Sequence, residues 1–304
     1  MNTVTIPETF ASTMRSVYGE EGGPWLERLP AIIAECEQRW DLRAGEPFAP
    51  LSYNYVTRAR RADGTTVVLK AGFPCRELRT EVEALCHFGG RGSVLLLEAD
   101  VELGAFVLEQ LEPGNTLEVN EDEAAAMAAA AGVMRQLWHP PPAGHSFPSV
   151  ADWGRGFERL RAAFDGGTGP YPEALVREAE DLYASLLASS AQPVVLHGDL
   201  HHGNILAAGR QPWLAIDPKG VTGEPAYEAG ALLRNPRPGL LSAPGARATL
   251  ARRSALLSEE LGIDRERLRG WSFAQAVLSA WWTYEDHGEP GQFALSCAEL
   301  LRED

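Results

Sequence analysis

The stretch VVLHGDLHHGNILAAGRQPWLAIDPKG, residues 194–220, decides how the rest of the chain is interpreted. Three short apolar runs within it are typical of strands, at residues 194–196, 205–207 and 213–216. The first run leads to Asp199, the second follows Asn204, and the third ends on Asp217. We therefore expect two carboxylates and one amide in neighbouring loops. This set suits phosphoryl transfer, because one carboxylate accepts a hydroxyl proton while the amide oxygen and the second carboxylate hold Mg2+.

The spacing within this stretch matches a known catalytic loop. His-x-Asp, four residues and Asn, followed by an Asp at the end of a strand, is the pattern of protein kinases. Here HGD stands in place of HRD, and Ile-Asp-Pro in place of DFG. With these departures the chain resembles the aminoglycoside phosphotransferase family. The strings HGDLHHGN, WLAIDPKG, GEPAYE and RNP resemble its streptomycin 6-phosphotransferase and hydroxyurea phosphotransferase branch, and the resemblance covers nearly the whole chain.

The resemblance implies an α+β fold, the bilobal fold of protein kinases. A small N-lobe, with an antiparallel sheet and a helical N-terminal extension, would occupy residues 1–111 and bind the nucleotide. A larger, mainly helical C-lobe, residues 112–304, would carry the catalytic loop and the substrate site. The patterns along the chain agree, because strand-like runs begin at Phe48 and an Ala-rich helical pattern follows Gly114.

Two helical segments are expected where glycine interrupts the pattern. A helix near Ile6 would be broken by Gly19, Gly22 and Gly23, and another would begin at Pro24. A single amphipathic helix is predicted over Ala151–Phe164.

Two other interpretations of the central stretch carry less weight. Asp and Asn are common in turns because their side chains bond the local backbone, so one such loop alone would say little. His197, His201 and His202 could suggest zinc, yet no cysteine or further histidine lies nearby in sequence to complete a ligand set. We expect His197 to brace the loop by hydrogen bonding instead.

Lys70 is the candidate phosphate ligand. It ends a strand-like run that follows a hairpin turn at Asp63-Gly64. A helix predicted over Arg76–Phe88 comes next, and the family's pattern places the partner of the lysine at Glu81. Glu77 lies on the same helix face and is the alternative. Such an ion pair would hold the ammonium group toward the nucleotide phosphates.

The resemblance implies further nucleotide contacts, at Ser52, Tyr53, Asn54, Glu109 and Leu111. The first three lie in the phosphate-covering loop, which lacks the GxGxxG pattern here. The last two lie at the hinge between the lobes, where backbone groups would bond adenine. Backbone contacts leave little trace in a sequence, so we expect ATP and keep GTP as the alternative.

The end of the last long predicted helix, Arg265–Glu285, is a candidate substrate site. The helix dipole disfavours acids such as Glu285 and Asp286 at this end, and local conflicts of this kind are often functional. A solvated helix end is the alternative. In the family, acids of the C-terminal helices line the aminoglycoside pocket. The resemblance therefore implies that Glu285 and Asp286, with Trp282, recognise a cationic substrate.

Composition restricts the partners of the chain. Its 304 residues are 45% hydrophobic and 23% charged, an ordinary globular balance with room for two lobes. The net charge of −15 argues against nucleic acid and suits a small cationic substrate, although acidic surfaces also keep proteins soluble.

No apolar stretch is long enough to span a bilayer. Four cysteines without CxxC pairing, and a start without a basic, apolar leader, predict a cytoplasmic protein. No obligate protein partner is evident from the sequence.

Taken together, these features predict an ATP- and Mg2+-dependent O-phosphotransferase. The resemblance implies 6-phosphorylation of a streptomycin-type aminoglycoside, which inactivates the antibiotic. Asp199 would orient the hydroxyl and accept its proton, Lys70 would bind the phosphates, and Asn204 and Asp217 would hold Mg2+. A kinase for hydroxyurea or another small metabolite is one alternative. A catalytically silent kinase-like binding protein is another, against which the complete set of residues argues.

Overall fold

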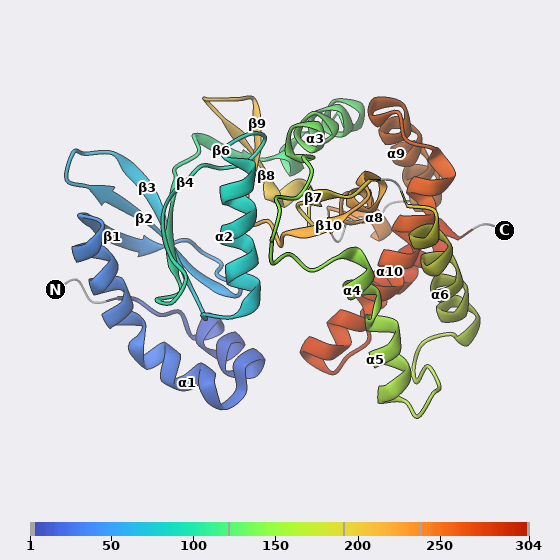
Figure 1. The fold of residues 1–304 in the computed structure, drawn as a ribbon, viewed down its shortest axis with the longest axis horizontal. Coiled ribbons are helices and arrows are strands. Elements are labelled where there is room, and N and C mark those ends of the chain that lie inside the picture. Colours follow the sequence, from blue (N-terminus) through green and yellow to red (C-terminus); the bar gives the residue numbers. More distant parts are fainter. Residues whose placement is uncertain (1–3, 121, 191, 237–238, 243, 303–304) are drawn as a thin grey trace. The chain divides into compact units, whose positions relative to one another are not determined.

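The computed structural model describes residues 4–120, 122–190, 192–236, 239–242 and 244–302. Residues 1–3, on which the expectation about a leader partly rests, lie outside this set. The chain forms two compact units, whose elements are labelled in Figure 1. Unit 1 comprises residues 1–90 and 94–114, and unit 2 comprises residues 91–93 and 115–304.

Unit 1 is built on a five-stranded antiparallel sheet. Its strands are β1 (Leu42–Pro47), β2 (Asn54–Arg61), β3 (Thr66–Gly72), β4 (Leu96–Asp100) and β5 (Ala105–Glu109). They lie in the order β1-β2-β3-β5-β4. The β2–β3 hairpin turns at Asp63-Gly64, where Asp63 accepts a hydrogen bond of 2.8 Å from the Thr65 N–H. Lys70 thus lies on β3, the central strand of the sheet.

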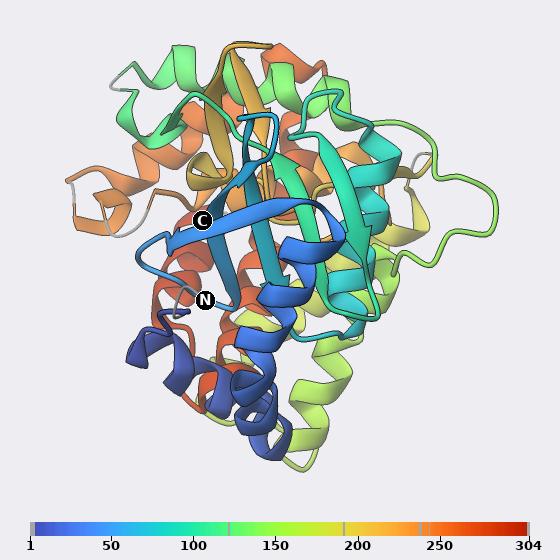
Figure 2. The ribbon, with the colours of Figure 1, turned by 90° about the vertical axis from the view of Figure 1, so that its left-hand side faces the viewer.

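Two helices accompany this sheet, α1 (Glu8–Arg39) and α2 (Arg76–Phe88). The α1 chain continues through two of the three glycines that were expected to break it, and only Gly19 departs from helical geometry, with φ of 51°. Figure 2 shows the change of direction. At Gly22 a Cβ atom would lie 2.3 Å from the Met14 carbonyl oxygen, so glycine is needed there for close packing rather than for a break. Apolar α1 side chains form one core with the sheet, and Phe10 contacts Tyr55 of β2.

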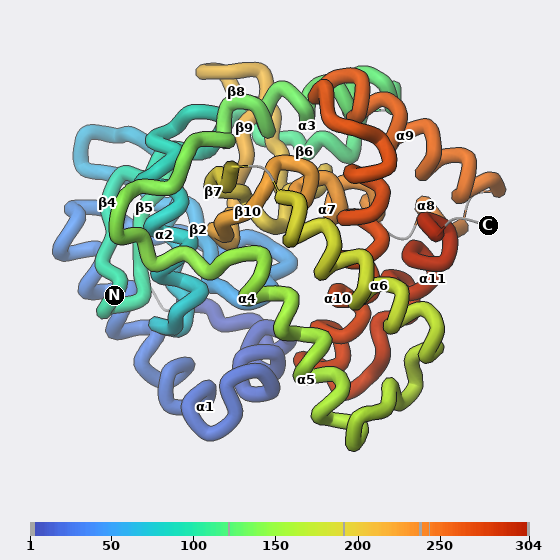
Figure 3. The backbone as a smooth tube through the Cα atoms, turned by 45° about the vertical axis from the view of Figure 1, so that its right-hand side comes forward, coloured from blue at the N-terminus to red at the C-terminus, as the bar shows by residue number. Residues whose placement is uncertain are grey.

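Unit 2 is mainly helical. Its helices are α3 (Glu123–Leu137), α4 (Val150–Gly154), α5 (Gly156–Ala163), α6 (Glu173–Ala188), α7 (Ala229–Leu233), α8 (Gly239–Ser242), α9 (Ala246–Leu261), α10 (Arg265–His287) and α11 (Gln292–Leu301). Short 3-10 turns are η1 (Leu117–Val119), η2 (His202–Asn204) and η3 (Pro225–Glu228). Helices α6 and α10 lie side by side (Figure 3). The buried Trp271 of α10 packs edge-on against Tyr183 and Tyr227.

Short strands carry the central stretch of the sequence. They are β6 (Pro113–Thr116), β7 (Val194–Leu196), β8 (Ile205–Ala208), β9 (Trp213–Ala215) and β10 (Val221–Gly223). β7 pairs with β10, and β8 pairs with β9, both in antiparallel fashion, while β6 lies beside β8. The three runs predicted as strands are strands, and the antiparallel sheet of unit 1 with the mainly helical unit 2 confirms the predicted α+β class.

The helix predicted over residues 151–164 is two helices, α4 and α5, so that expectation was wrong. Ser149 begins α4 with a capping box, and the chain turns at Arg155. Glycines flank the turn because neighbours approach closely. A Cβ at Gly154 would lie 2.5 Å from Tyr183, and one at Gly156 would lie 2.9 Å from Leu278. The helical period was thus visible, but the tertiary contacts that interrupt it were not.

Two further features concern the chain as a whole. All four cysteines are free, with Cys36 and Cys297 buried, Cys75 half-buried and Cys86 exposed. Within the described ranges, no helix combines the length and the apolar character that a bilayer crossing requires.

Candidate active site

The loop after β7 is fixed by the side chain of His197. This residue is fully buried, and its Nε2 lies 2.7 Å from the Ile216 carbonyl oxygen, to which it donates. Its Nδ1 faces the backbone N–H of Asp199 at 3.3 Å. A neutral imidazole with the proton on Nε2 satisfies both contacts. His197 therefore ties the segment that holds Asp199 to the end of β9, as the sequence led us to expect.

Two further hydrogen bonds, both made by Asn204, bring the three predicted residues of the central stretch together. Asn204 donates from Nδ2 to the Asp199 carbonyl oxygen at 3.0 Å. Its own carbonyl accepts from the Ile216 N–H at 2.9 Å, one residue before Asp217. The Asp217 backbone lies in the left-handed region with φ of 60°, which Asp adopts more readily than most residues. Asp199, Asn204 and Asp217 thus form one loop cluster within unit 2.

Glu228 holds the backbone of the segment before Asp199 in place. It was not identified from the sequence. Its Oε2 accepts from the His197 N–H at 2.7 Å, and its Oε1 accepts from the Gly198 N–H at 2.9 Å. Burial raises the pKa of Glu228 to about 7, although the two N–H groups favour its charged form. The signal available in the sequence was the string GEPAYE. That string also supplies Glu224, which accepts from Arg267 and from the Trp271 indole N–H.

We expect the buried His197 to make stability depend on pH. Burial lowers the pKa of His197 to about 4, whereas the unfolded chain would bind this proton near pH 6.5. The unfolded state therefore gains a proton first as pH falls. The free energy of unfolding should drop between pH 6.5 and 4, by up to about 1.4 kcal/mol per pH unit for this group. Denaturant unfolding at a series of pH values measures the slope.

His197→Gln should make this pH dependence shallower, whatever its effect on stability at neutral pH. His287→Gln, which removes an exposed imidazole at the end of α10, is the matched control and should keep the wild-type slope. Identical slopes in the wild type and in His197→Gln would contradict the assignment.

The donor set of Asn204 and Asp217 fits Mg2+. Because the Asn204 Nδ2 is bonded to a backbone carbonyl, the amide oxygen is the group left to face a cation. Asp217 is exposed and supplies a carboxylate. Mg2+ usually takes one or two carboxylates with phosphate oxygens and water. Among the described residues, no group of three or more His, Cys, Asp or Glu side chains could hold a metal ion.

The candidate phosphate ligand in unit 1 is deeply buried with its partner. The Lys70 Nζ lies 2.6 Å from the Glu81 Oε1, and the two side chains are 3% and 9% exposed. Glu77, the alternative partner, is exposed on the same helix. The ammonium also lies over the Phe106 ring, 5.5 Å from its centroid. A buried ion pair of this kind fixes the direction of the lysine side chain.

The other residues assigned to the nucleotide lie at the ends of strands in unit 1. Ser52 and Tyr53 are exposed in the loop before β2. Asn54 begins β2, and its side chain covers Gly72, where a Cβ would lie 2.1 Å from the Asn54 Oδ1. Glu109 ends β5, and both its N–H and its carboxylate bond the backbone of Leu95. Leu111 is buried, and its carbonyl accepts from the Gln110 side chain.

The candidate substrate residues lie on the last turns of α10. Glu285 accepts two hydrogen bonds from Arg159 of α5, of 2.6 and 3.0 Å, so the conflict with the helix dipole is offset by an ion pair. The helix runs on to His287 and ends at Gly288 in the left-handed region. Asp286 is exposed.

Trp153 connects this helix end with the loop cluster. Trp282 packs edge-on against Trp153, with ring centroids 5.5 Å apart. A Cβ at Gly198 would lie 2.7 Å from the Cη2 of Trp153. The indole of Trp153 thus lies against the residue before Asp199 on one side and against Trp282 on the other. The sequence did not single out Trp153, which falls where a single helix was predicted.

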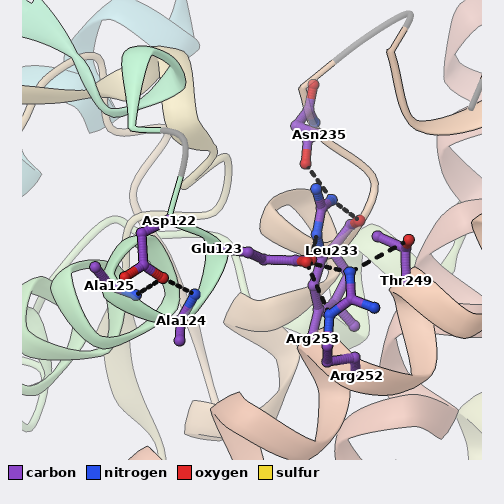
Figure 4. A network of polar contacts seen from close by, with 9 residues as sticks. All are labelled: Asp122, Glu123, Ala124, Ala125, Leu233, Asn235, Thr249, Arg252 and Arg253. Atoms are coloured by element: carbon purple, nitrogen blue, oxygen red, sulfur yellow. Dashed lines mark hydrogen bonds and ion pairs between the residues drawn. The ribbon is translucent and has the colours of Figure 1, made fainter.

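A second polar network fixes the segment that follows α7 (Figure 4). Glu123 of α3 pairs with Arg252 and with Arg253 of α9, the latter at 2.6 Å. Arg253 also donates to the carbonyl oxygens of Leu233, at 3.1 Å, and Asn235, at 2.6 Å. Asp122 points the other way and caps α3. The network therefore holds the backbone on both sides of Arg234, through the carbonyl groups of Leu233 and Asn235.

A comparison with known protein families shows which family the chain belongs to. The sequence pattern of the family described as aminoglycoside/hydroxyurea antibiotic resistance kinases matches residues 39–287, which include the loop cluster and Lys70. The chain belongs to this family. It is a kinase, and the predicted resemblance is confirmed.

Two relatives resemble this kinase over nearly all of its length. The streptomycin 6-kinase of Streptomyces glaucescens is 34% identical over 304 residues, which are 98% of this chain and 97% of the relative. The hydroxyurea phosphotransferase of Kitasatospora aureofaciens is 35% identical over 310 residues, 98% of this chain and 84% of the relative. The enzyme class predicted from the sequence, a phosphotransferase of this family, is therefore confirmed.

A solved structure supports the fold of the kinase. The aminoglycoside phosphotransferase APH(4)-Ia, in a ternary complex with ADP and hygromycin B, gives a TM-score of 0.60 at 14% identity. The match covers 90% of this chain and 98% of that one. At this identity the likeness concerns the fold alone.

Proposed function

We propose that this kinase transfers the γ-phosphoryl group of ATP to a hydroxyl group of a streptomycin-type aminoglycoside, at position 6. The observation that carries the proposal is the loop cluster of Asp199, Asn204 and Asp217, in a chain that is 34% identical to a streptomycin 6-kinase over almost its whole length. Phosphorylation at that position would inactivate the antibiotic.

Each residue of the proposed site has a chemical role. Asp199 orients the acceptor hydroxyl and takes its proton as the oxygen attacks phosphorus. Because the transition state is loose, the orientation contributes more than the basicity. Asn204 and Asp217 would hold Mg2+, which supplies positive charge to the phosphate oxygens when it is bound. Lys70, directed by Glu81, binds nucleotide phosphates.

The units correspond to roles in the same proposal. Residues 1–111 would form the nucleotide-binding lobe, with contacts from Ser52, Tyr53 and Asn54 to phosphates and from Glu109 and Leu111 to adenine. Residues 112–304 would form the lobe of catalysis and substrate binding. A cytoplasmic location is proposed as well, and the free state of all four cysteines supports it. The net charge of −15 favours a cationic small molecule over nucleic acid as the partner.

A second candidate substrate is hydroxyurea, because the hydroxyurea phosphotransferase of Kitasatospora aureofaciens is 35% identical to this chain. The two substrates differ in charge, since streptomycin carries guanidinium groups and hydroxyurea is neutral. An assay that couples ADP release to a signal, run with streptomycin, other aminocyclitols, hydroxyurea and amino sugars, separates the candidates. Phosphorus NMR of the product then locates the modified hydroxyl.

Turnover with streptomycin and with none of the neutral compounds supports the proposal. Turnover with hydroxyurea alone would change the assigned substrate to hydroxyurea and leave the phosphotransferase class unchanged. Nucleotide binding without turnover on any compound would instead support a silent binding protein.

The substrate assignment predicts a change in KM. Neutralising the two acids, Glu285→Gln with Asp286→Asn, should raise the KM for streptomycin by at least about tenfold, because each acid loses a charged hydrogen bond. The KM for ATP should stay unchanged. Arg159→Met should lower the KM for streptomycin, because it removes the internal guanidinium that pairs with Glu285 and leaves this carboxylate to the substrate. Steady-state kinetics with each substrate varied measures both.

The matched control is Glu20→Gln with Glu21→Gln, two exposed acids on α1. It changes the net charge by the same amount and should leave both KM values as in the wild type. An unchanged KM for streptomycin in the Glu285 and Asp286 variant would mean that these acids do not bind the substrate. Glu285 would then only pair with Arg159, and Asp286 would only be solvated.

A further inference from the structure

The distribution of lysine in the chain is unusual. Of the 27 lysine and arginine residues, only Lys70 and Lys219 are lysines. The ion pairs of unit 2 described above use arginine, and so does the brace at Glu224. Lysine thus occurs at two positions in a chain whose other cationic side chains of this kind are guanidinium groups. The two groups are not interchangeable, because lysine is a compact point charge whereas arginine is a planar fork.

The first of these positions is the proposed phosphate ligand, and the second lies in the loop cluster. Lys219 follows Asp217 by two residues, in the string IDPKG. Its backbone N–H donates to the His197 carbonyl oxygen at 2.8 Å. A Cβ at Gly198 would lie 3.3 Å from the Cβ of Lys219, so the root of the lysine side chain lies against the residue before Asp199. The backbone of Lys219 and the first atom of its side chain are therefore fixed beside the segment that holds Asp199.

The charge balance of the loop cluster shows why a cation is needed there. Asp199, Asp217 and Glu228 contribute three carboxyl groups. Two arginines of unit 2 that are largely buried pair with other acids. Arg267 pairs with Glu224, and Arg253 pairs with Glu123. Nucleotide phosphates that approach two carboxylates are repelled unless positive charge is added. Mg2+ held by Asn204 and Asp217 would supply part of this charge, and a lysine ammonium adds a further point charge that does not require a planar, bidentate partner.

We propose that the Nζ of Lys219 binds the transferring phosphoryl group during the reaction. The inference rests on the proposed function and adds a catalytic residue to it. In the step, the bond between the γ-phosphorus and the bridging oxygen of ADP breaks, and a bond from the acceptor oxygen to phosphorus forms. The hydroxyl proton passes to the Asp199 carboxylate. Lys219 keeps its protons throughout and donates hydrogen bonds to the equatorial oxygens, where charge is spread in the transition state.

A purely structural role is the rival, in which Lys219 only neutralises the carboxylates and keeps the loop in shape. The two roles differ in what they do to nucleotides. A lysine that contacts the γ-phosphoryl group strengthens binding of AMP-PNP and has no effect on ADP, which lacks that group. A lysine that maintains the loop affects both nucleotides alike.

The test uses the full-length Lys219→Met, which keeps the aliphatic stem against Gly198 and removes the charge. We expect kcat to fall by about 100- to 1,000-fold, the usual effect of losing one donor to transition-state charge. Affinity for AMP-PNP should weaken by about tenfold or more, and affinity for ADP should stay unchanged. In Lys219→Ala, added ethylammonium should restore part of kcat, because it replaces the missing ammonium group.

The matched control is Arg247→Met on α9, which removes one positive charge and two hydrogen bonds to backbone carbonyls near the C-terminus. It should keep the wild-type kcat. A kcat of Lys219→Met equal to that of the control overturns the inference, and so does an equal loss of AMP-PNP and ADP binding. If wild type transfers to no acceptor, the proposed function fails by itself, and the nucleotide comparison still decides the role of Lys219.

Discussion

Asp199→Asn should lower kcat by about two to four decades while nucleotide affinity stays nearly unchanged. The magnitude is that of a positioned base in proton transfer. Asparagine keeps the shape of the side chain, and the backbone contacts of residue 199 with His197 and Asn204 do not involve the carboxylate. The loss should therefore concern the acceptor hydroxyl alone. Steady-state kinetics and calorimetric titration with AMP-PNP measure the two quantities.

The control for this variant is Asp165→Asn, an exposed acid in the loop after α5. The backbone of Asp165 has a positive φ, which asparagine accepts as readily as aspartate does. The change therefore neutralises one carboxylate of unit 2 without strain. It should keep wild-type turnover. Wild-type-like turnover in Asp199→Asn would remove Asp199 from the mechanism.

Asp217→Ala should bring transfer below detection. The substitution removes the one carboxylate of the proposed Mg2+ set and leaves only the Asn204 amide, which cannot balance a divalent cation by itself. Raising the Mg2+ concentration should rescue Asn204→Asp, which retains two oxygen ligands, far better than Asp217→Ala. Activity as a function of Mg2+ concentration in both variants gives the comparison.

Asp181→Ala, at an exposed position on α6, is the matched control and should titrate with Mg2+ as the wild type does. Transfer by Asp217→Ala in the presence of a chelator would contradict the metal assignment and, with it, the proposed kinase mechanism.

The parts of the fold that were predictable from sequence are those with local causes. The runs beside Asp199, Asn204 and Asp217 are strands because they are short, apolar and bounded by turn residues. The helix Arg76–Phe88 has the predicted bounds, because its period is regular and Gly89 stops it in the left-handed region.

Other parts depended on contacts between segments far apart in the chain. Glu228 is 30 and 31 residues from the two amides that it braces, and nothing in GEPAYE indicates that Glu228 bonds these amides while Glu224 pairs with Arg267. Similarly, the sequence pointed to Glu285 but not to its partner Arg159. Gly22 was expected to break α1, yet it only allows close packing against Met14. Packing, rather than local propensity, decided each case: the partners of Glu228 and Glu285 are distant in the sequence, and Gly22 packs against Met14 across the kink at Gly19.

The positions of the free thiols make the two units distinguishable to a chemical reagent. Cys36, Cys75 and Cys86 belong to unit 1, and Cys297 is the single cysteine of unit 2 in the sequence. Because Cys297 is fully buried on α11, a maleimide reaches it only when α11 moves away from α10. Cys86 is exposed and is labelled in the folded chain. The rate at which Cys297 is labelled therefore reports how often the C-terminal helices open, and the rate at Cys86 serves as the internal standard.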